Sequence, residues 1–255
     1  MNTKRPMYSL VDIAPTIAEL TKTPLPGADG VVIPELMASF RNCHCKRVVL
    51  IIIDSLDYPI YRKLEDVMPH LHGIIIMCKS VASHTTPAIA SILTGCYPAT
   101  HKILATADVP TSPIKSLLER AVDSNISAAL VIESEGADAM RTKIDLVEGV
   151  ADSDDMLDYD IKIKQLSLNI LKKKPVITAI HFRAIDRYAH EERSFKDLVT
   201  AAEKIDQHIS DIIEAMGSDA CVIICGDHPI HAKHDMYNTG KSDQLFICLL
   251  TKNEV

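Results

Sequence analysis

The chain has 255 residues, of which 47% are hydrophobic and 24% charged, and its formal net charge is −7 at pH 7. This composition is typical of a globular protein with a substantial core, and the acidic balance argues against a general nucleic-acid binder. No apolar run approaches the roughly 18 residues of a membrane span, and no apolar stretch follows residues 1–6, so we expect a cytoplasmic protein without a signal peptide. The seven cysteines have no framework spacing and are expected to be reduced.

Short apolar runs alternate with helical patterns along the chain, which predicts an α/β fold with a mostly parallel central sheet and helices on both faces. The β-branched runs predict strands at 48–53, 73–78, 127–132, 176–182, 220–225 and 245–250. Apolar spacing and capping residues predict helices at 59–67, 87–93, 112–122, 157–171 and 195–216, the second closed by Gly95 and the third capped by Ser112. Because no linker divides the chain, residues 1–255 are predicted to form one domain.

Residues of the type that bind metals follow three of these predicted strands. Asp54 comes directly after the first, Asp186 and His190 follow the fourth, and Asp227 and His228 follow the fifth. In an open α/β sheet, functional residues collect at the carboxyl ends of the strands. We therefore expect these side chains to meet at one edge of the sheet, where carboxylates and imidazoles suit two neighbouring divalent metals.

Each of these residues also has a structural explanation. Asp54 and Asp227 could cap the helices that follow them, and the pair Asp186 and His190 could belong to a surface turn. Thr85 and Thr86 precede Pro87 at a predicted helix start, where threonine usually serves as an N-cap. A threonine hydroxyl becomes a nucleophile only when a base or a metal activates it. The sequence Cys43-His44-Cys45 places its ligands too close together for a usual structural zinc site.

The whole pattern resembles the alkaline phosphatase superfamily, and most closely its type I phosphodiesterase and nucleotide pyrophosphatase branch. The most specific part is residues 85–101, where Thr94-Gly95-Cys96-Tyr97-Pro98-Ala99-Thr100-His101 is similar to the Thr-Gly-x-Tyr-Pro-x-x-His of that branch. Aligned on this stretch, Thr85 falls on the nucleophilic threonine and Thr86 on a variable residue.

The resemblance implies a three-layer α/β/α core and two divalent metal ions, with zinc favoured and manganese the next choice. One metal would be held by Asp54, Thr85, Asp227 and His228. The other would be held by Asp186, His190 and a third histidine, for which His234 fits better than His231.

A second resemblance concerns the order of the chain. Residues 9–20, with the Pro/Gly-rich stretch 24–30, are similar to a segment near the carboxyl end of many members of this superfamily. Here the segment comes first, so residues 1–36 are interpreted as a circularly permuted part of the core. The larger cap domain of the family has no room in this chain.

These observations predict a metal-dependent phosphoester hydrolase of the phosphodiesterase and nucleotide pyrophosphatase type, acting on a small-molecule phosphoester without nucleic-acid or membrane partners. The alternatives are a phosphomonoesterase, a sulfatase or phosphomutase relative, or a non-catalytic member that binds metal or nucleotide. A sulfatase would need an arginine that the stretch from Cys96 to Thr100 lacks, and a phosphomutase normally needs a second domain.

Overall fold

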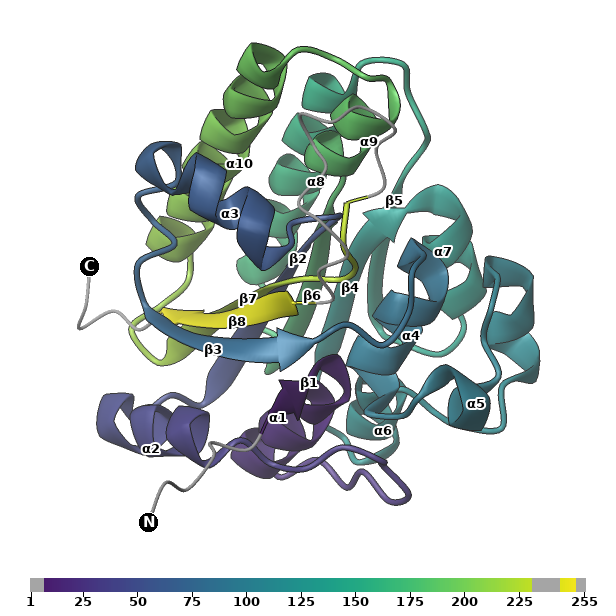
Figure 1. Ribbon diagram of the computed structural model, residues 1–255. Helices are drawn as coiled ribbons and strands as arrows, with labels where there is room; N and C mark the ends of the chain where they lie inside the picture. The colour runs from purple at the N-terminus through teal and green to yellow at the C-terminus, as the bar shows by residue number, and fades with distance from the viewer. Residues whose placement is uncertain (1–6, 231–243, 251–255) are drawn as a thin grey trace.

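The computed structural model describes residues 7–230 and 244–250, and its centre is an eight-stranded sheet (Figure 1). The strand order is β1-β3-β8-β7-β2-β6-β4-β5. All pairs are parallel except those that β8 makes with β3 and β7. The strands are β1 (Tyr8–Ser9), β2 (Arg47–Ile53), β3 (Ile74–Lys79), β4 (Ala128–Glu133), β5 (Leu146–Val150), β6 (Ile177–Phe182), β7 (Ala220–Gly226) and β8 (Gln244–Leu250). The prediction of a mostly parallel α/β sheet is confirmed.

Helices cover both faces of this sheet, which explains why its central strands are apolar on both sides. In β2, Val49, Ile51 and Ile53 pack into one core cluster, whereas Val48, Leu50 and Ile52 pack into the other. The first cluster lies under α3 (Tyr58–Leu64), α8 (Met156–Leu171), α9 (Ala184–His190) and α10 (Phe195–Ala215). The second lies under α1 (Ile13–Thr21), α2 (Pro34–Cys43), α4 (Thr85–Thr94), α6 (Leu117–Asp123) and α7 (Ser134–Met140). None of the described helices has the length and apolar character needed to cross a bilayer.

Three details of the fold differ from the sequence-based expectation. Residues 106–111 form a 3-10 helix, and α6 begins at Leu117, because Ser116 and Glu119 form a capping box that fixes the helix start four residues after Ser112. The predicted elements did not include the strands β1 and β5 or the helices α1, α2, α5 (Pro98–His101), α7 and α9. Cys43 and Cys45 are joined in a disulfide, so the expectation of reduced thiols was wrong for this pair, whereas the other five cysteines are buried thiols.

The first described segment lies on the same face of the sheet as α4. The short strand β1 pairs with β3, next to β8, and Leu10, Ile13 and Ile17 share a core cluster with Leu245 of β8. The loop after α1 is held by backbone bonds from the N–H groups of residues 29 and 30 to the carbonyl of Gly95. The segment that the sequence analysis interpreted as permuted is therefore built into the core beside the helix that carries Thr85.

Candidate active site

The side chains predicted to form the site lie at the carboxyl ends of the three central strands. Asp54 follows β2, Asp227 follows its neighbour β7, and Asp186 lies on α9, which follows the other neighbour, β6. Gly226, the last residue of β7, has a steric role, because a Cβ there would come within 2.1 Å of the backbone oxygen of Leu56. This close approach allows the turn after β2 to lie directly against the end of β7, and it brings Asp54 and Asp227 together.

Thr85, Asp54 and His228 form the first cluster of contacts. The Thr85 hydroxyl lies 3.3 Å from Oδ1 of Asp54 and 3.1 Å from Nε2 of His228, and the same nitrogen lies 3.2 Å from Oδ1 of Asp54. Thr85 is the first residue of α4, and His84, not Thr85, is the N-cap. The hydroxyl of Thr85 therefore faces the carboxylate and the imidazole instead of capping its own helix.

Ser55 connects the other ligand-type residues. Its backbone N–H donates to Oδ1 of Asp227 at 3.0 Å, and its hydroxyl donates to Oδ1 of Asp186 at 2.6 Å. The same hydroxyl lies 3.2 Å from Nδ1 of His228. The backbone of Ser55 is in the left-handed region, at φ 59°. Non-glycine residues adopt this conformation rarely, and where they do the surrounding structure holds them there, often at functional sites.

His181, on β6, is a member of the cluster that the sequence analysis missed. Its Nε2 lies 3.5 Å from Oδ2 of Asp54, longer than a normal hydrogen bond, and both of its ring nitrogens are buried without a hydrogen-bond partner. Oδ2 of Asp227 is likewise buried without a hydrogen-bond partner, and Nε2 of His228 lies 3.6 Å from it. Ligand atoms of Asp54, His181 and Asp227 all lie within 4.8 Å of one another, as do those of Asp54, Asp186 and His228.

Burial and mutual repulsion shape the ionisation of these groups. Burial raises the pKa of Asp227, and the charge of Asp54 raises it further. Burial alone would also raise the pKa of Asp54, but contacts with His181 and His228 lower it below its usual range. In turn, Asp227 and Asp54 raise the pKa of His228 against the effect of its burial. Several carboxylates are thus held together in a buried place, an arrangement that is costly unless positive charge is present.

The donor set of the cluster fits a divalent metal. It combines carboxylate oxygens with imidazole nitrogens, and it includes one buried carboxylate oxygen and one buried imidazole without partners. The second predicted site is described in part. His190 lies on α9 with its Nε2 3.5 Å from Oδ1 of Asp186, and the two side chains line one hollow together with Thr85 and His228. His231 and His234 lie outside the described residues.

Two further residues near the site, His101 and Arg183, have well-defined contacts. His101, from the motif that carried the resemblance, is buried and structural, because its Nδ1 accepts from the N–H of Ile103 and its Nε2 therefore donates to the Ser91 hydroxyl at 3.0 Å. Arg183, directly after β6, places its Nε 4.0 Å from Oδ2 of Asp54 and its guanidinium over the Tyr159 ring. Arg183 lines a polar hollow together with Thr85 and His181.

Sequence reasoning missed His181, Ser55 and Arg183, and only the first left a usable signal. His181 is the one polar ring in the otherwise apolar end of a strand that is buried on both faces, where an imidazole needs a partner. Ser55 and Arg183 follow strand ends but are common loop residues, so their types alone indicate nothing.

The comparison with known protein families finds a match over part of the chain. Residues 135–243 match the family model described as the Metalloenzyme superfamily. The search of curated proteins finds no match.

Several solved structures have a similar fold. Phosphonoacetate hydrolase from Sinorhizobium meliloti 1021, in complex with phosphonoacetate, has a TM-score of 0.58 at 14% sequence identity, and the match covers 74% of this chain and 57% of that one. A putative sulfatase from Bacteroides thetaiotaomicron has a TM-score of 0.60 at 12% identity, covering 80% of this chain and 64% of that one. A 2-O GAG sulfatase has a TM-score of 0.55 at 11% identity, with the same coverages of 80% and 64%. This chain thus spans somewhat more than half of the length of these neighbours. The family-model match and the shared fold together confirm that this chain resembles the alkaline phosphatase-like metalloenzymes.

Proposed function

We propose that this protein is a metal-dependent hydrolase of phosphoesters that uses Thr85 as its nucleophile. The observation that carries the proposal is the direction of the Thr85 hydroxyl, which faces Asp54 and His228 at 3.3 and 3.1 Å within a cluster of buried carboxylates and imidazoles. An N-cap threonine would instead direct its oxygen to its own helix. The finer assignment, a phosphodiesterase of the nucleotide pyrophosphatase type, rests on the similarity of residues 85–101 to that branch.

The proposed metal ligands divide into two sets. Asp54, Asp227, His228 and Thr85 would hold one divalent ion, and Asp186 and His190, with His234 or His231, would hold the other. We add His181 to the first set, because its imidazole is buried, unpartnered and close to Asp54 and Asp227. Zinc suits this mixture of imidazole and carboxylate best, with manganese as the next choice. When bound, the ions would stabilise the threonine alkoxide and the negative charge that develops on the leaving oxygen.

The chain's own residues supply the rest of the proposed mechanism. Thr85 attacks phosphorus as its hydroxyl proton passes to solvent, so that a P–O bond to Thr85 forms as the bond to the leaving oxygen breaks, and the leaving alkoxide or aryloxide takes up a proton from water. Nε2 of His228 lies 3.1 Å from the Thr85 hydroxyl and is placed to accept its hydrogen bond. On the other side of the ring, Nδ1 lies 3.2 Å from the Ser55 hydroxyl, and this contact orients the imidazole. The first turn of α4 presents N–H groups that favour the phosphoryl oxygens, and Arg183, whose guanidinium pairs with Asp152 at 3.3 Å, lines the polar hollow. Water then hydrolyses the phosphothreonine and restores Thr85.

Two neighbouring threonines test this proposal. Thr85→Ala should remove nearly all hydrolysis of bis(p-nitrophenyl) phosphate by the zinc-loaded protein, because no other residue supplies the attacking oxygen. Thr86→Ala removes the same hydroxyl one residue away and should retain most of the rate. Measurement of kcat and of zinc per chain for both variants decides the matter. Comparable rates for Thr85→Ala and the unchanged protein would contradict a covalent mechanism.

The same assay separates the alternative functions. p-Nitrophenyl phosphate tests a phosphomonoesterase, p-nitrophenyl sulfate tests a sulfatase, and phosphonoacetate tests the reaction named for one structural neighbour. A protein that binds zinc but turns over none of these compounds would support the non-catalytic alternative.

A further inference from the structure

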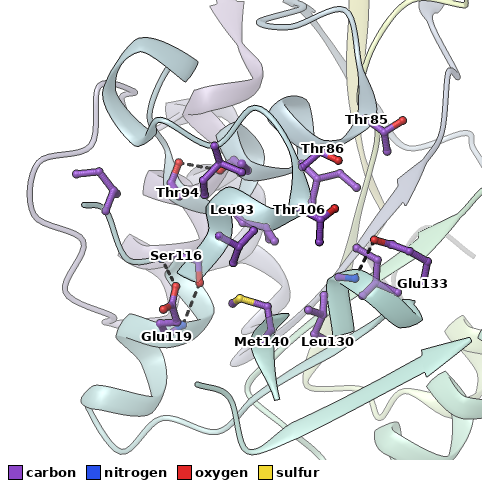
Figure 2. Close-up of a pocket in the computed structure, with 17 residues that line it drawn as sticks. Thr85, Thr86, Leu93, Thr94, Thr106, Ser116, Glu119, Leu130, Glu133 and Met140 are labelled. Carbon is purple, nitrogen blue, oxygen red and sulfur yellow. Dashed lines mark hydrogen bonds between the residues drawn. The ribbon is translucent and has the colours of Figure 1, made fainter. Parts of the chain in front are cut away.

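A largely apolar pocket opens beside Thr85 on the face of the sheet covered by α4 (Figure 2). Its cavity volume is about 90 Å³. It lies between α4, the end of β4, α7 and the loop that precedes α6. Figure 2 shows Thr85 and Thr86 at one end of the pocket, Ser116 and Glu119 at the other, and Leu93 between them. The pocket therefore leads from the proposed nucleophile towards the interior of the protein.

The residues that line the pocket disfavour a negatively charged ligand group. Most of the wall is apolar, and its larger side chains include Ile89, Leu93, Ile103, Leu130, Ile132 and Met140. No lysine, arginine or histidine is among the described residues that line the pocket. An anionic group would thus enter without a positive partner, whereas an uncharged apolar group would be removed from water favourably.

The two carboxylates in the wall already have partners. Glu119 accepts from the Ser116 N–H at 2.7 Å and lies 3.4 Å from Nζ of Lys143, while Glu133 accepts from the Gly136 N–H at 3.1 Å. Both carboxylates accept hydrogen bonds from backbone N–H groups at the start of a helix, so neither points to a role in binding a cationic ligand. The apolar wall is therefore the part of the pocket that defines its occupant.

On its other side, Thr85 borders a polar hollow that contains His181 and Arg183 together with Glu133, Glu135 and Asp152. Thr85, Thr86 and Thr106 line both spaces, as does Glu133, so the apolar pocket and the polar hollow meet there. A ligand that spans the junction therefore carries a polar group at one end and an apolar group at the other.

We propose that the apolar pocket binds one uncharged organic substituent of the substrate, a short alkyl chain or a single aromatic ring, while the phosphoryl group lies at Thr85. This inference rests on the proposed function and narrows its substrate class to phosphoesters with a small apolar substituent. Nucleotide-like or sugar-like substituents, which carry many polar groups, do not match the aliphatic wall, so this inference keeps the phosphoester hydrolase but replaces the nucleotide substrates of the nucleotide pyrophosphatase branch with smaller apolar esters.

Non-hydrolysable phosphonates test the inference on the zinc-loaded protein without any need for turnover. n-Butylphosphonate should bind about tenfold more tightly than methylphosphonate, because its chain leaves water for the pocket. 4-Phosphonobutyrate, a chain of similar length that ends in a carboxylate, should bind no more tightly than methylphosphonate. Equal affinity for the butyl and methyl compounds, or tighter binding of the carboxylate, would overturn the proposal.

A filling variant with a matched control locates the effect. Ala90 lies on α4 and lines the pocket, so the larger side chain of Ala90→Leu should occupy the cavity. The butyl preference, which is the Kd of methylphosphonate divided by the Kd of n-butylphosphonate, should then fall to about one to two. Ala38, exposed on α2, gives the control Ala38→Leu, which adds the same atoms far from the site and should keep the preference. A preference that survives in Ala90→Leu would refute the placement of the substituent. Thermal unfolding shows whether Ala90→Leu folds, and the phosphonate series on the unchanged protein is decisive if it does not.

Turnover distinguishes a failure of this inference from a failure of the proposed function. If both butyl and methyl p-nitrophenyl phosphates are hydrolysed but n-butylphosphonate binds no more tightly than methylphosphonate, the pocket assignment is wrong and the hydrolase proposal stands. If neither ester is hydrolysed but the tenfold butyl preference in binding is present, the pocket assignment stands and the hydrolase proposal is wrong.

Discussion

At the scale of single residues, two buried histidines show how strongly the neighbours of a side chain decide its role. His181 and His208 both have buried ring nitrogens without hydrogen-bond partners. His208, on α10, packs against the ring of Phe182, and burial lowers its pKa to about 4, so it is a neutral core residue. His181 instead faces Asp54, and that contact raises its pKa in spite of its burial.

We predict that His181→Ala weakens zinc binding by about tenfold or more, because an imidazole beside two carboxylates is lost from the first proposed site. His208→Ala removes the same atoms from the core and should leave zinc affinity unchanged while it lowers stability. Zinc retained after dialysis against a competing chelator, measured by elemental analysis, compares the two variants. If both variants retain zinc equally well, His181 is a core residue like His208.

The residues that could be predicted from the sequence are those that follow strand ends. Asp54, Asp186 and Asp227 were predicted to lie at one edge of the sheet, and the structure brings them together through Ser55. His181 could not be placed in this way, because the face that a residue inside a buried strand presents depends on the register of its neighbours. The pairing of His181 with Ile52 of β2 becomes visible only when the sheet is formed.

At the scale of the secondary-structure elements, the accuracy of prediction followed the strength of the pattern. β2, β6 and β7 are buried throughout and mostly apolar, and α10 has a regular apolar stripe, so their positions were predicted to within about one or two residues. β5 was missed, because an edge strand is only half-buried and this one contains Glu148 and Gly149. The turn that places β2 against β7 also left no pattern, since it depends on one close backbone contact at Gly226.

This contact makes Gly226→Ala a sharp test of how the elements position the site. The added methyl group would meet the Leu56 carbonyl at 2.1 Å, so the turn that carries Asp54 and Ser55 must move. We expect a loss of about 1–3 kcal/mol in the free energy of unfolding, together with a loss of bound zinc.

Gly217, before β7, provides the control for this substitution. A Cβ there would meet only the ends of the Arg47 and Asp219 side chains, at 2.9 and 3.0 Å, and these can rotate away. Gly217→Ala should therefore cost less than Gly226→Ala in urea unfolding and should keep its zinc. An equal loss of unfolding free energy in the two variants would show that the backbone at Leu56 moves away from the added methyl group at little cost.

At the scale of the whole molecule, the first segment of the chain is part of the core. Leu10, Ile13 and Ile17 are fully buried, and each contributes about 1.5–3 kcal/mol on burial, so together they provide an amount comparable to the net stability of a domain. A chain that lacks residues 1–26 should therefore be insoluble or unfolded. Loss of the segment cannot by itself show that it is permuted, because any core segment would have this effect.

The sheet register supplies the argument that the permutation is physically possible. β1 runs parallel to β3, with Tyr8 opposite Cys78, whereas β8 runs antiparallel to β3, with Cys78 opposite Leu245. Tyr8 therefore lies level with Leu245, near the start of β8, and the chain enters β1 from the side towards which β8 runs. Two strand spacings and about five residues of rise separate Tyr8 from Leu250, a span of roughly 20 Å. A flexible linker of about ten residues covers that distance.

We predict that a rearranged chain, residues 27–255 followed by such a linker and residues 1–26, folds to the same structure. The new ends lie between Pro26 and Gly27, which are both exposed, so no buried contact is cut. The rearranged protein should bind as much zinc as the original and should differ in its free energy of unfolding by only about 1–2 kcal/mol, since the contacts are kept and only the loop that is closed has changed. Circular dichroism, urea unfolding and elemental analysis provide the comparison. A rearranged chain that cannot fold would show that the order of the segments matters to this protein, and the interpretation of residues 1–36 as a permuted piece of the core would have to be abandoned.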